Sequence, residues 1–200
     1  MTRSVTALLL IVLQGGAAVA GHAQRGARAV CFRAMPGDHC RGFLITEFAT
    51  LVGPATGYRR PPANMIWDVG YAHHIQPRRA VGASLTVIAD DDGRVLVGIR
   101  PRFRQWLDPH TSLDIAPAIL IGHTDAGGQR MRYPGVSAYV GVGWRDLVAL
   151  NAQVEVIRLA GLDHAQTAWL FGLRLASYAG LVAAPLGAAF VTYAKSFGDN

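Results

Sequence analysis

The sequence is poor in charge and nearly free of lysine. Asp, Glu, Lys and Arg make up only 16% of its 200 residues, against about 25% in a typical soluble domain. Of its 19 basic residues, only Lys195 is a lysine. The arginines are scattered along the chain, whereas a nucleic-acid-binding surface gathers its basic residues into a stripe. We therefore expect no nucleic-acid partner, despite a formal net charge of +6.

Motifs that would indicate a cofactor or a metal ion are also missing. The glycines do not fall in the strand-to-helix context of a phosphate-binding loop. His73 and His74 are adjacent, and adjacent residues of a strand point to opposite faces, so one ion cannot easily bind both. The acidic run at 90–93 lacks the alternating spacing and the final glutamate of a calcium loop. The sequence thus predicts no metal site and no cofactor.

Cysteine is limited to Cys31 and Cys40. Their spacing, with His39 as the one adjacent histidine, does not match a zinc site. In an oxidising compartment the simplest outcome is one local disulfide. On the chain-entropy model, closing so short a loop stabilises the fold by about 2.5–3 kcal/mol.

The first 23 residues have the three parts of a secretory signal peptide. Arg3 gives a positive start, an apolar run follows at 5–13, and Ala18-Val19-Ala20 supplies small residues for cleavage. The apolar run is too short to span a bilayer as a helix, which needs about 20 residues. We expect cleavage after Ala20 or Ala23 and a mature protein that works outside the cytoplasm.

Eight runs of alternating apolar residues follow, separated by turn residues. In the run 147–158, for example, Val148 and Leu150 share one face, while Asn151 and Gln153 share the other. A period of two residues is that of a β-strand, and short connections imply antiparallel neighbours. The predicted strands span residues 42–51, 64–75, 81–90, 94–104, 112–122, 135–144, 147–158 and 168–178.

These runs are long for a soluble domain. Ordinary strands average about five or six residues, whereas a strand that crosses a membrane needs about 9–11. The less apolar faces carry mostly small residues and isolated charges, as the interior of a narrow barrel does. We predict an all-β, antiparallel up-and-down meander over 42–178 that closes into a roughly eight-stranded barrel, preceded by a disulfide-bearing segment at 24–41.

Isolated charges on the predicted inward faces must be paired, because an unpaired buried charge is very costly. A salt-bridge network inside the barrel is therefore favoured over a site for anionic ligands or lipid phosphates. The residues of this predicted network are Asp68, Arg100, Arg102, Arg104, Asp114 and Glu155.

The signal peptide, the eight long runs, the short turns and the isolated inward charges together resemble the small eight-stranded outer-membrane β-barrel proteins. The resemblance covers about residues 42–178 and is one of architecture. It implies residence in the outer membrane of a Gram-negative-type bacterium, with membrane lipids as partners. Barrels of this size have several functions, so the resemblance does not assign one.

The C-terminal segment at 179–200 does not continue the alternation. Residues 179–194 are apolar on every face, and no charge occurs from Leu175 to Ala194. We favour a helix of small residues here, with a closing strand or a membrane-spanning helix as alternatives.

One motif suggests enzymatic chemistry. His110-Thr111-Ser112 is similar to the His-x-Ser of outer-membrane lipid A deacylases, and Asp114 would fall on the same strand face. That family has an Asn after the Ser and a Glu further on, where this chain has Leu113 and Asp125. The competing interpretation is a turn whose hydroxyls bond locally.

Three functions remain open. The first is a non-enzymatic outer-membrane barrel that is structural or interacts through its loops. The second is a soluble periplasmic barrel that binds a small apolar ligand, with the two faces exchanged. The third is a lipid-modifying acyl hydrolase that uses His110 and Ser112.

Overall fold

The computed structural model of this chain describes residues 29–34, 36, 40–54, 63–90, 94–126, 129–158 and 165–183, without the side chains of 123–133. The predicted signal peptide, residues 1–23, lies outside the described residues, as does the tail from residue 184. Among the described residues, no helix has both the length and the apolar character to cross a membrane.

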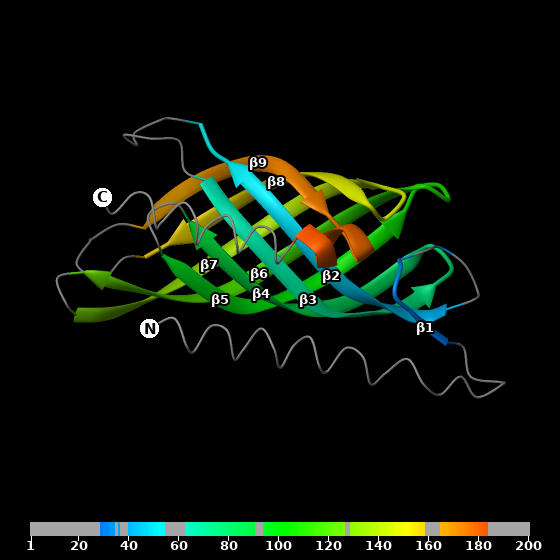
Figure 1. Cartoon of the computed structure of the whole chain (residues 1–200), viewed down its shortest axis with the longest axis horizontal. Coiled ribbons are helices and arrows are strands. Elements are labelled where there is room, and N and C mark those ends of the chain that lie inside the picture. The colour runs from blue at the N-terminus through cyan, green and yellow to red at the C-terminus, as the bar shows by residue number, and fades with distance from the viewer. Residues whose placement is uncertain are drawn as a thin grey trace.

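One sheet contains all the strands in chain order, and it closes on itself because β2 also pairs with β9 (Figure 1). The pairs from β2 to β9 are all antiparallel. The all-β, up-and-down, eight-stranded barrel predicted from the sequence is confirmed. Its strands are β2 (Cys40–Val52), β3 (Ala63–Gln76), β4 (Arg79–Asp90), β5 (Val95–Trp106), β6 (Thr111–Ala126), β7 (Gln129–Trp144), β8 (Val148–Ile157) and β9 (Gln166–Leu175).

Each strand agrees with a predicted run, with differences at the ends. The largest extension is in the β6–β7 hairpin, where the ladder continues to Ala126 and Gln129, beyond the predicted limits of 122 and 135. Glycine-rich turn chemistry at 125–128 indicated the hairpin, but the pairing reaches almost to its tip. Strand ends depend on partner backbone, which local sequence does not specify.

The last predicted run, 168–178, is wrong at its end. Strand β9 stops at Leu175 and residues 177–183 are helical, so the predicted helix starts earlier than residue 179. Ser177 has a φ of 53°, which turns the chain out of the strand. A Cβ at Gly180 would collide with the carbonyl oxygen of Thr46, so glycine there allows the helix to pack closely on β2.

A short strand in the disulfide-bearing segment was not predicted. Strand β1 (Ala29–Cys31) pairs in parallel with the start of β2, Ala29 opposite Cys40 and Cys31 opposite Phe43. Strand β9 pairs with β2 only from Phe48 to Val52. Along the same edge of β2, its first residues therefore pair with β1 and its last residues pair with β9.

The two ends of the barrel differ in their connections. At the end that carries the Cys31–Cys40 disulfide, called here the disulfide end, the strands are joined through residues 77–78, 107–110 and 145–147. At the opposite end the connections are 53–62, 91–94, 127–128 and 158–165. The disulfide end therefore has uniformly short turns and also holds the start of β2 and the end of β9.

Candidate functional site

The interior of the barrel is arranged in layers along the strands. An apolar cluster lies towards the opposite end and includes Leu51, Ile66, Ile88, Leu96 and Leu120. A second apolar cluster at the disulfide end includes Phe43, Ile45, Trp106 and Ala34, with Cys31 packed against it. On β5, the inward residues between Leu96 and Trp106 are Arg100, Arg102 and Arg104. A charged layer therefore separates two apolar layers.

Asp114 and Glu47 are the central carboxylates of this charged layer. Asp114 accepts two hydrogen bonds from Arg104, at 2.6 Å from Nε and 2.9 Å from Nη2, and another from Arg174. Glu47 accepts from Arg104 at 3.0 Å, from Arg174 at 3.1 Å and from Arg102. The guanidinium of Arg104 is thus shared between these two carboxylates and Asp146, and its pair of bonds to Asp114 is the fork geometry that arginine favours.

A third carboxylate, Asp68, extends the layer towards Arg100. Asp68 Oδ2 lies 2.8 Å from Arg100 Nη1 and 3.2 Å from Arg102 Nη2, and Ser84 donates to its other oxygen at 3.3 Å. Tyr139 lies among the cations: Arg174 donates to its hydroxyl at 2.6 Å. The guanidinium carbons of Arg100, Arg102 and Arg174 lie 5.0, 5.4 and 5.3 Å from its ring centre. The ring face adds cation–π attraction to the ion pairs.

Glu155 joins this layer through a relay of amides. Its Oε1 accepts from Asn64 at 3.0 Å and from Gln153 at 2.6 Å, and the side-chain oxygen Oε1 of Gln153 accepts from Arg100 at 3.4 Å. Within the described residues no arginine pairs directly with Glu155. The structure therefore places all six residues of the predicted network in the interior. Glu155 is connected to the arginines through Gln153.

Four further members of the charged layer were not singled out from the sequence: Glu47, Tyr139, Asp146 and Arg174. The signal for Glu47, Tyr139 and Arg174 was available, because each lies at an inward position of its own alternating run. Asp146 had no such signal, since it lies in a turn with a φ of 52°. Burial raises the pKa of Asp146, an effect that Arg104 and the hydroxyl of Ser177 partly oppose.

The outer face of the same strands is apolar. Ile119 is 72% exposed and Leu150 is 68% exposed, whereas the inward Arg100 is 1% exposed. Other outward side chains that are exposed include Leu85, Ile99, Val136, Val142, Trp144, Trp169, Phe171 and Leu173. The usual arrangement of a water-soluble β-protein is inverted.

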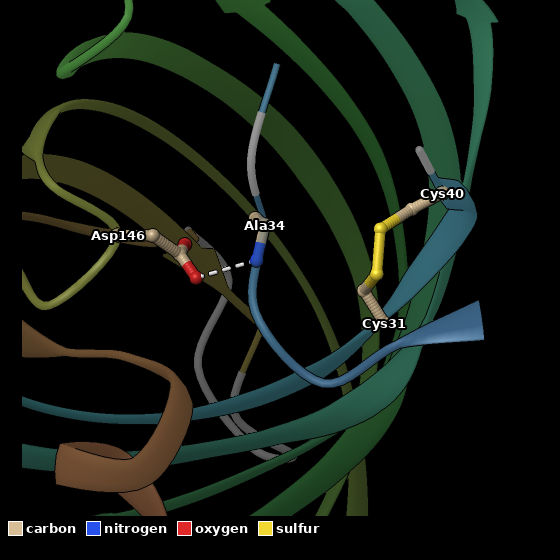
Figure 2. The surroundings of a disulfide bond; sticks show 4 residues. All are labelled: Cys31, Ala34, Cys40 and Asp146. Atoms are coloured by element: carbon tan, nitrogen blue, oxygen red, sulfur yellow. Dashed lines mark hydrogen bonds between the residues drawn. A yellow bond between two sulfur atoms is a disulfide. The ribbon is translucent and has the colours of Figure 1, made fainter. Parts of the chain in front are cut away.

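The disulfide predicted between Cys31 and Cys40 is confirmed. It holds the N-terminal segment at the mouth of the barrel, where the backbone N–H of Ala34 donates to Asp146 at 2.7 Å (Figure 2). Asp146 also accepts from Arg104 at 2.7 Å and from the hydroxyl of Ser177. One turn carboxylate thereby connects the N-terminal segment, the charged layer and the C-terminal helix.

A cavity of about 300 Å³ opens beside this junction. Its lining includes two of the predicted catalytic candidates, His110 and Ser112. The third candidate, Asp114, is fully buried and bonded to Arg104 and Arg174. Among the described residues no hydrogen bond joins these three candidates. Asp108 instead accepts the backbone N–H groups of His110 and Thr111 at 2.7 and 2.8 Å, which is a local turn motif.

Comparisons with known proteins assign no family. No family model matches this chain, and no curated protein matches it. A solved structure described as "De novo design of transmembrane beta-barrels" is similar, with a TM-score of 0.40 and 10% sequence identity. The similarity covers 72% of this chain and 98% of that one. What this protein does must therefore be inferred from its own side chains.

Proposed function

We propose that this protein is an outer-membrane β-barrel without catalytic activity, which acts as a structural component or interacts through its ends. The observation that carries the proposal is the inversion of the two faces. Exposed isoleucine, leucine, valine and aromatic side chains surround the barrel, and the side chains of the charged layer are buried inside. Apolar side chains gain free energy outside water, so hydrocarbon is the solvent that suits this surface.

Strand length supports the same setting. The barrel strands run from 10 residues in β8 and β9 to 16 in β6 and β7, and about 9–11 tilted residues cross a bilayer. Closure of the sheet pairs its edge strands, which is required of β-structure in lipid.

The interior favours a role other than a pore. Two apolar layers and the charged layer of Arg100, Arg102, Arg104, Arg174 and their carboxylates occupy the inside of the described barrel. Small barrels are filled in this way by their own side chains. We expect no measurable ion conductance after reconstitution into planar bilayers.

The turns suggest an orientation. Bacterial outer-membrane barrels have short turns on the periplasmic side and longer loops outside the cell. By this rule the disulfide end, with turns 77–78, 107–110 and 145–147, faces the periplasm. The opposite end, where β2 ends at Val52 and β8 at Ile157, would then face outwards and offer a surface for interaction.

The face assignment also weighs against the soluble alternative. A barrel that carries an apolar ligand in water needs a polar exterior and an apolar cavity. Here the cavity at the disulfide end has a mixed lining, with arginine, histidine, serine and aspartate beside tryptophan, alanine and proline. The acyl hydrolase alternative loses support because Asp114 is bonded to two arginines and does not orient His110 in this structure.

Fractionation of cells that express the full-length chain tests the proposal. We expect detergent to be needed for extraction, and an unboiled sample to migrate faster than a boiled one on a denaturing gel. Recovery in the soluble periplasmic fraction without detergent would contradict the proposal. As a matched test of the enzymatic alternative, acyl release by the wild-type barrel should be no greater than by Ser112→Ala.

A further inference from the structure

The wall of the cavity at the disulfide end is held together by hydrogen bonds between segments that are distant in the sequence. Arg33 comes from the N-terminal segment, and its Nη2 donates to the carbonyl oxygen of Arg145 at 2.6 Å. Arg145 in turn donates its backbone N–H to the carbonyl of His110 at 2.6 Å. Three segments that are distant in the sequence are thereby joined around one cavity, which all three residues line.

The turn that presents Arg145 is a tight β-hairpin turn, in which the N–H of Leu147 donates to the carbonyl of Trp144 at 3.1 Å. Arg145 and Asp146 have φ values of 51° and 52°, a region that residues other than glycine rarely adopt. Bonds from Ala34 and Arg104 to Asp146 hold this conformation. Positive φ at both central residues is what a type I′ hairpin turn requires, and this turn places Arg145 in the lining of the cavity.

The cavity carries uncompensated positive charge. Of its charged lining residues, Asp146 is already paired with Arg104. Within the described part of the chain, no carboxylate forms an ion pair with Arg33 or Arg145. The Nε of Arg33 is buried without a hydrogen-bond partner, and Arg145 lies over the Trp144 ring at 4.8 Å. Two arginines, Arg33 and Arg145, therefore line this cavity without a carboxylate partner among the described residues.

We propose that this cavity binds a phosphate group, with Arg33 and Arg145 as its main ligands and His110 and Ser112 as further polar contacts. Arginine presents a planar fork of donors that matches the oxygens of a phosphate. A volume of about 300 Å³ is at the lower end of the range for ligand pockets, which suits a small headgroup or a free anion. The site is independent of where the barrel resides, so its test can fail while the proposed membrane function stands.

Calorimetric titration of the folded full chain in a phosphate-free detergent provides the test. Inorganic phosphate is added at constant ionic strength, balanced with chloride, and we expect saturable binding. Arg33→Gln and Arg145→Gln should each weaken binding by roughly tenfold or more, since a hydrogen bond to a charged group has about this effect. Arg33→Lys should lie between wild type and Arg33→Gln, because it keeps the charge but loses the fork.

Arg78→Gln is the matched control, because Arg78 is exposed in the 77–78 turn at the same end and is not part of the cavity lining. It should bind phosphate within about twofold of wild type. Absence of saturation up to about 10 mM phosphate in wild type, or equal weakening in Arg78→Gln, would overturn the proposal. Unboiled gel migration identical to wild type establishes that each variant is folded.

Dihexanoyl phosphatidic acid, a soluble lipid with the same phosphate chemistry, distinguishes the sources of the ligand. Tighter binding of this lipid than of inorganic phosphate, lost in Arg33→Gln, would support a lipid headgroup as the natural ligand. Equal affinities would support a free phosphate or a small phosphate ester. Lipid binding that is unchanged in both Arg33→Gln and Arg145→Gln would contradict the site.

Discussion

The two faces of strand β5 differ in the chemistry and in the exposure of their side chains. Val95, Val97 and Ile99 point outwards and are exposed, whereas Arg100, Arg102 and Arg104 point inwards and are buried. Both sets come from one stretch of twelve residues. The comparison shows that paired charges are buried in this protein while many apolar residues are exposed, because the apolar residues have a different solvent available in the proposed membrane setting.

The stability of the inner face depends on ion pairs between its own side chains, whereas that of the outer face depends on the solvent around the barrel. Each buried guanidinium of the charged layer contacts at least one carboxylate. The Nε atoms of Arg100, Arg102 and Arg174 are nevertheless buried without partners. Buried ion pairs gain little free energy overall, but removal of one partner is strongly destabilising. The two faces should therefore respond very differently to substitution.

The largest effect is expected from Asp114→Ala on the inner face. It removes one of the two carboxylates that Arg104 and Arg174 share, the other being Glu47, and removal of one member of a buried pair costs about 3–5 kcal/mol. The free energy of unfolding in urea, measured in detergent or vesicles, would show the loss. The neighbouring outward substitution Ile115→Ala is the control and should cost much less; similar losses at both positions would contradict the comparison.

The second effect concerns the outer face. Ile119→Arg places a charge on an outward position near the middle of β6, and an arginine at the bilayer midplane costs about 2–4 kcal/mol. Leu107→Arg, in the 107–110 turn, should cost about 0–1 kcal/mol because it lies beyond the strands. Unfolding in lipid vesicles measures both. A neutral Ile119→Arg would favour a water-facing exterior instead.

A smaller effect, here a gain in stability, is expected where the hydrogen bonding between β5 and β6 is interrupted. Ile99 pairs with Ile119 and Phe103 with Ile115, so Pro101 and Pro117 lie opposite each other between these pairs. Neither proline has an N–H, and the ladder is interrupted there. Pro101→Val restores one donor opposite the Pro117 carbonyl, which should stabilise the β5–β6 pair by about 0.5–1.5 kcal/mol. Slower amide exchange at Phe103 would show it; unchanged exchange would mean that the interruption has another cause.

The smallest effect is expected at a turn that belongs to neither face. Hydrogen bonds from the backbone N–H of His110 and from Thr111 lower the pKa of Asp108. A carboxyl whose folded pKa is lowered contributes stability above its unfolded pKa, about 3.9, and loses it as the pH falls through the folded pKa. Asp108→Ala should therefore reduce the acid dependence of unfolding below about pH 4. An identical pH profile in the two proteins would show that this turn does not contribute.

The sequence predicted much of the charged layer because alternation assigns each strand residue to a face. The parity that placed Asp68 and Arg104 inside also applied to Glu47 and Arg174, which lie on the same inward faces. Which charge pairs with which could not be predicted. Arg174 is 127 residues from Glu47, and only closure of the sheet between β2 and β9 brings them together.

Other features required the folded chain altogether. Strand β1 consists of three residues, too short for a periodic signal. The phosphate cavity is assembled from Arg33, His110 and Arg145, which no local pattern connects. The turn at Arg145 is closed locally by the bond from Leu147 to Trp144, but only the bonds from Ala34 and Arg104 to Asp146 join it to the N-terminal segment and the charged layer.

By itself, the sequence determined the alternation of faces, the antiparallel meander and the disulfide. These follow from short-range rules: a period of two residues in strands, turn chemistry between neighbours and the pairing of two close cysteines. Only the tertiary structure decided the register, the ion-pair partners, the end of β9 and the cavity at the disulfide end. Each of these depends on residues distant in the chain, which come together because the sheet twists and closes on itself.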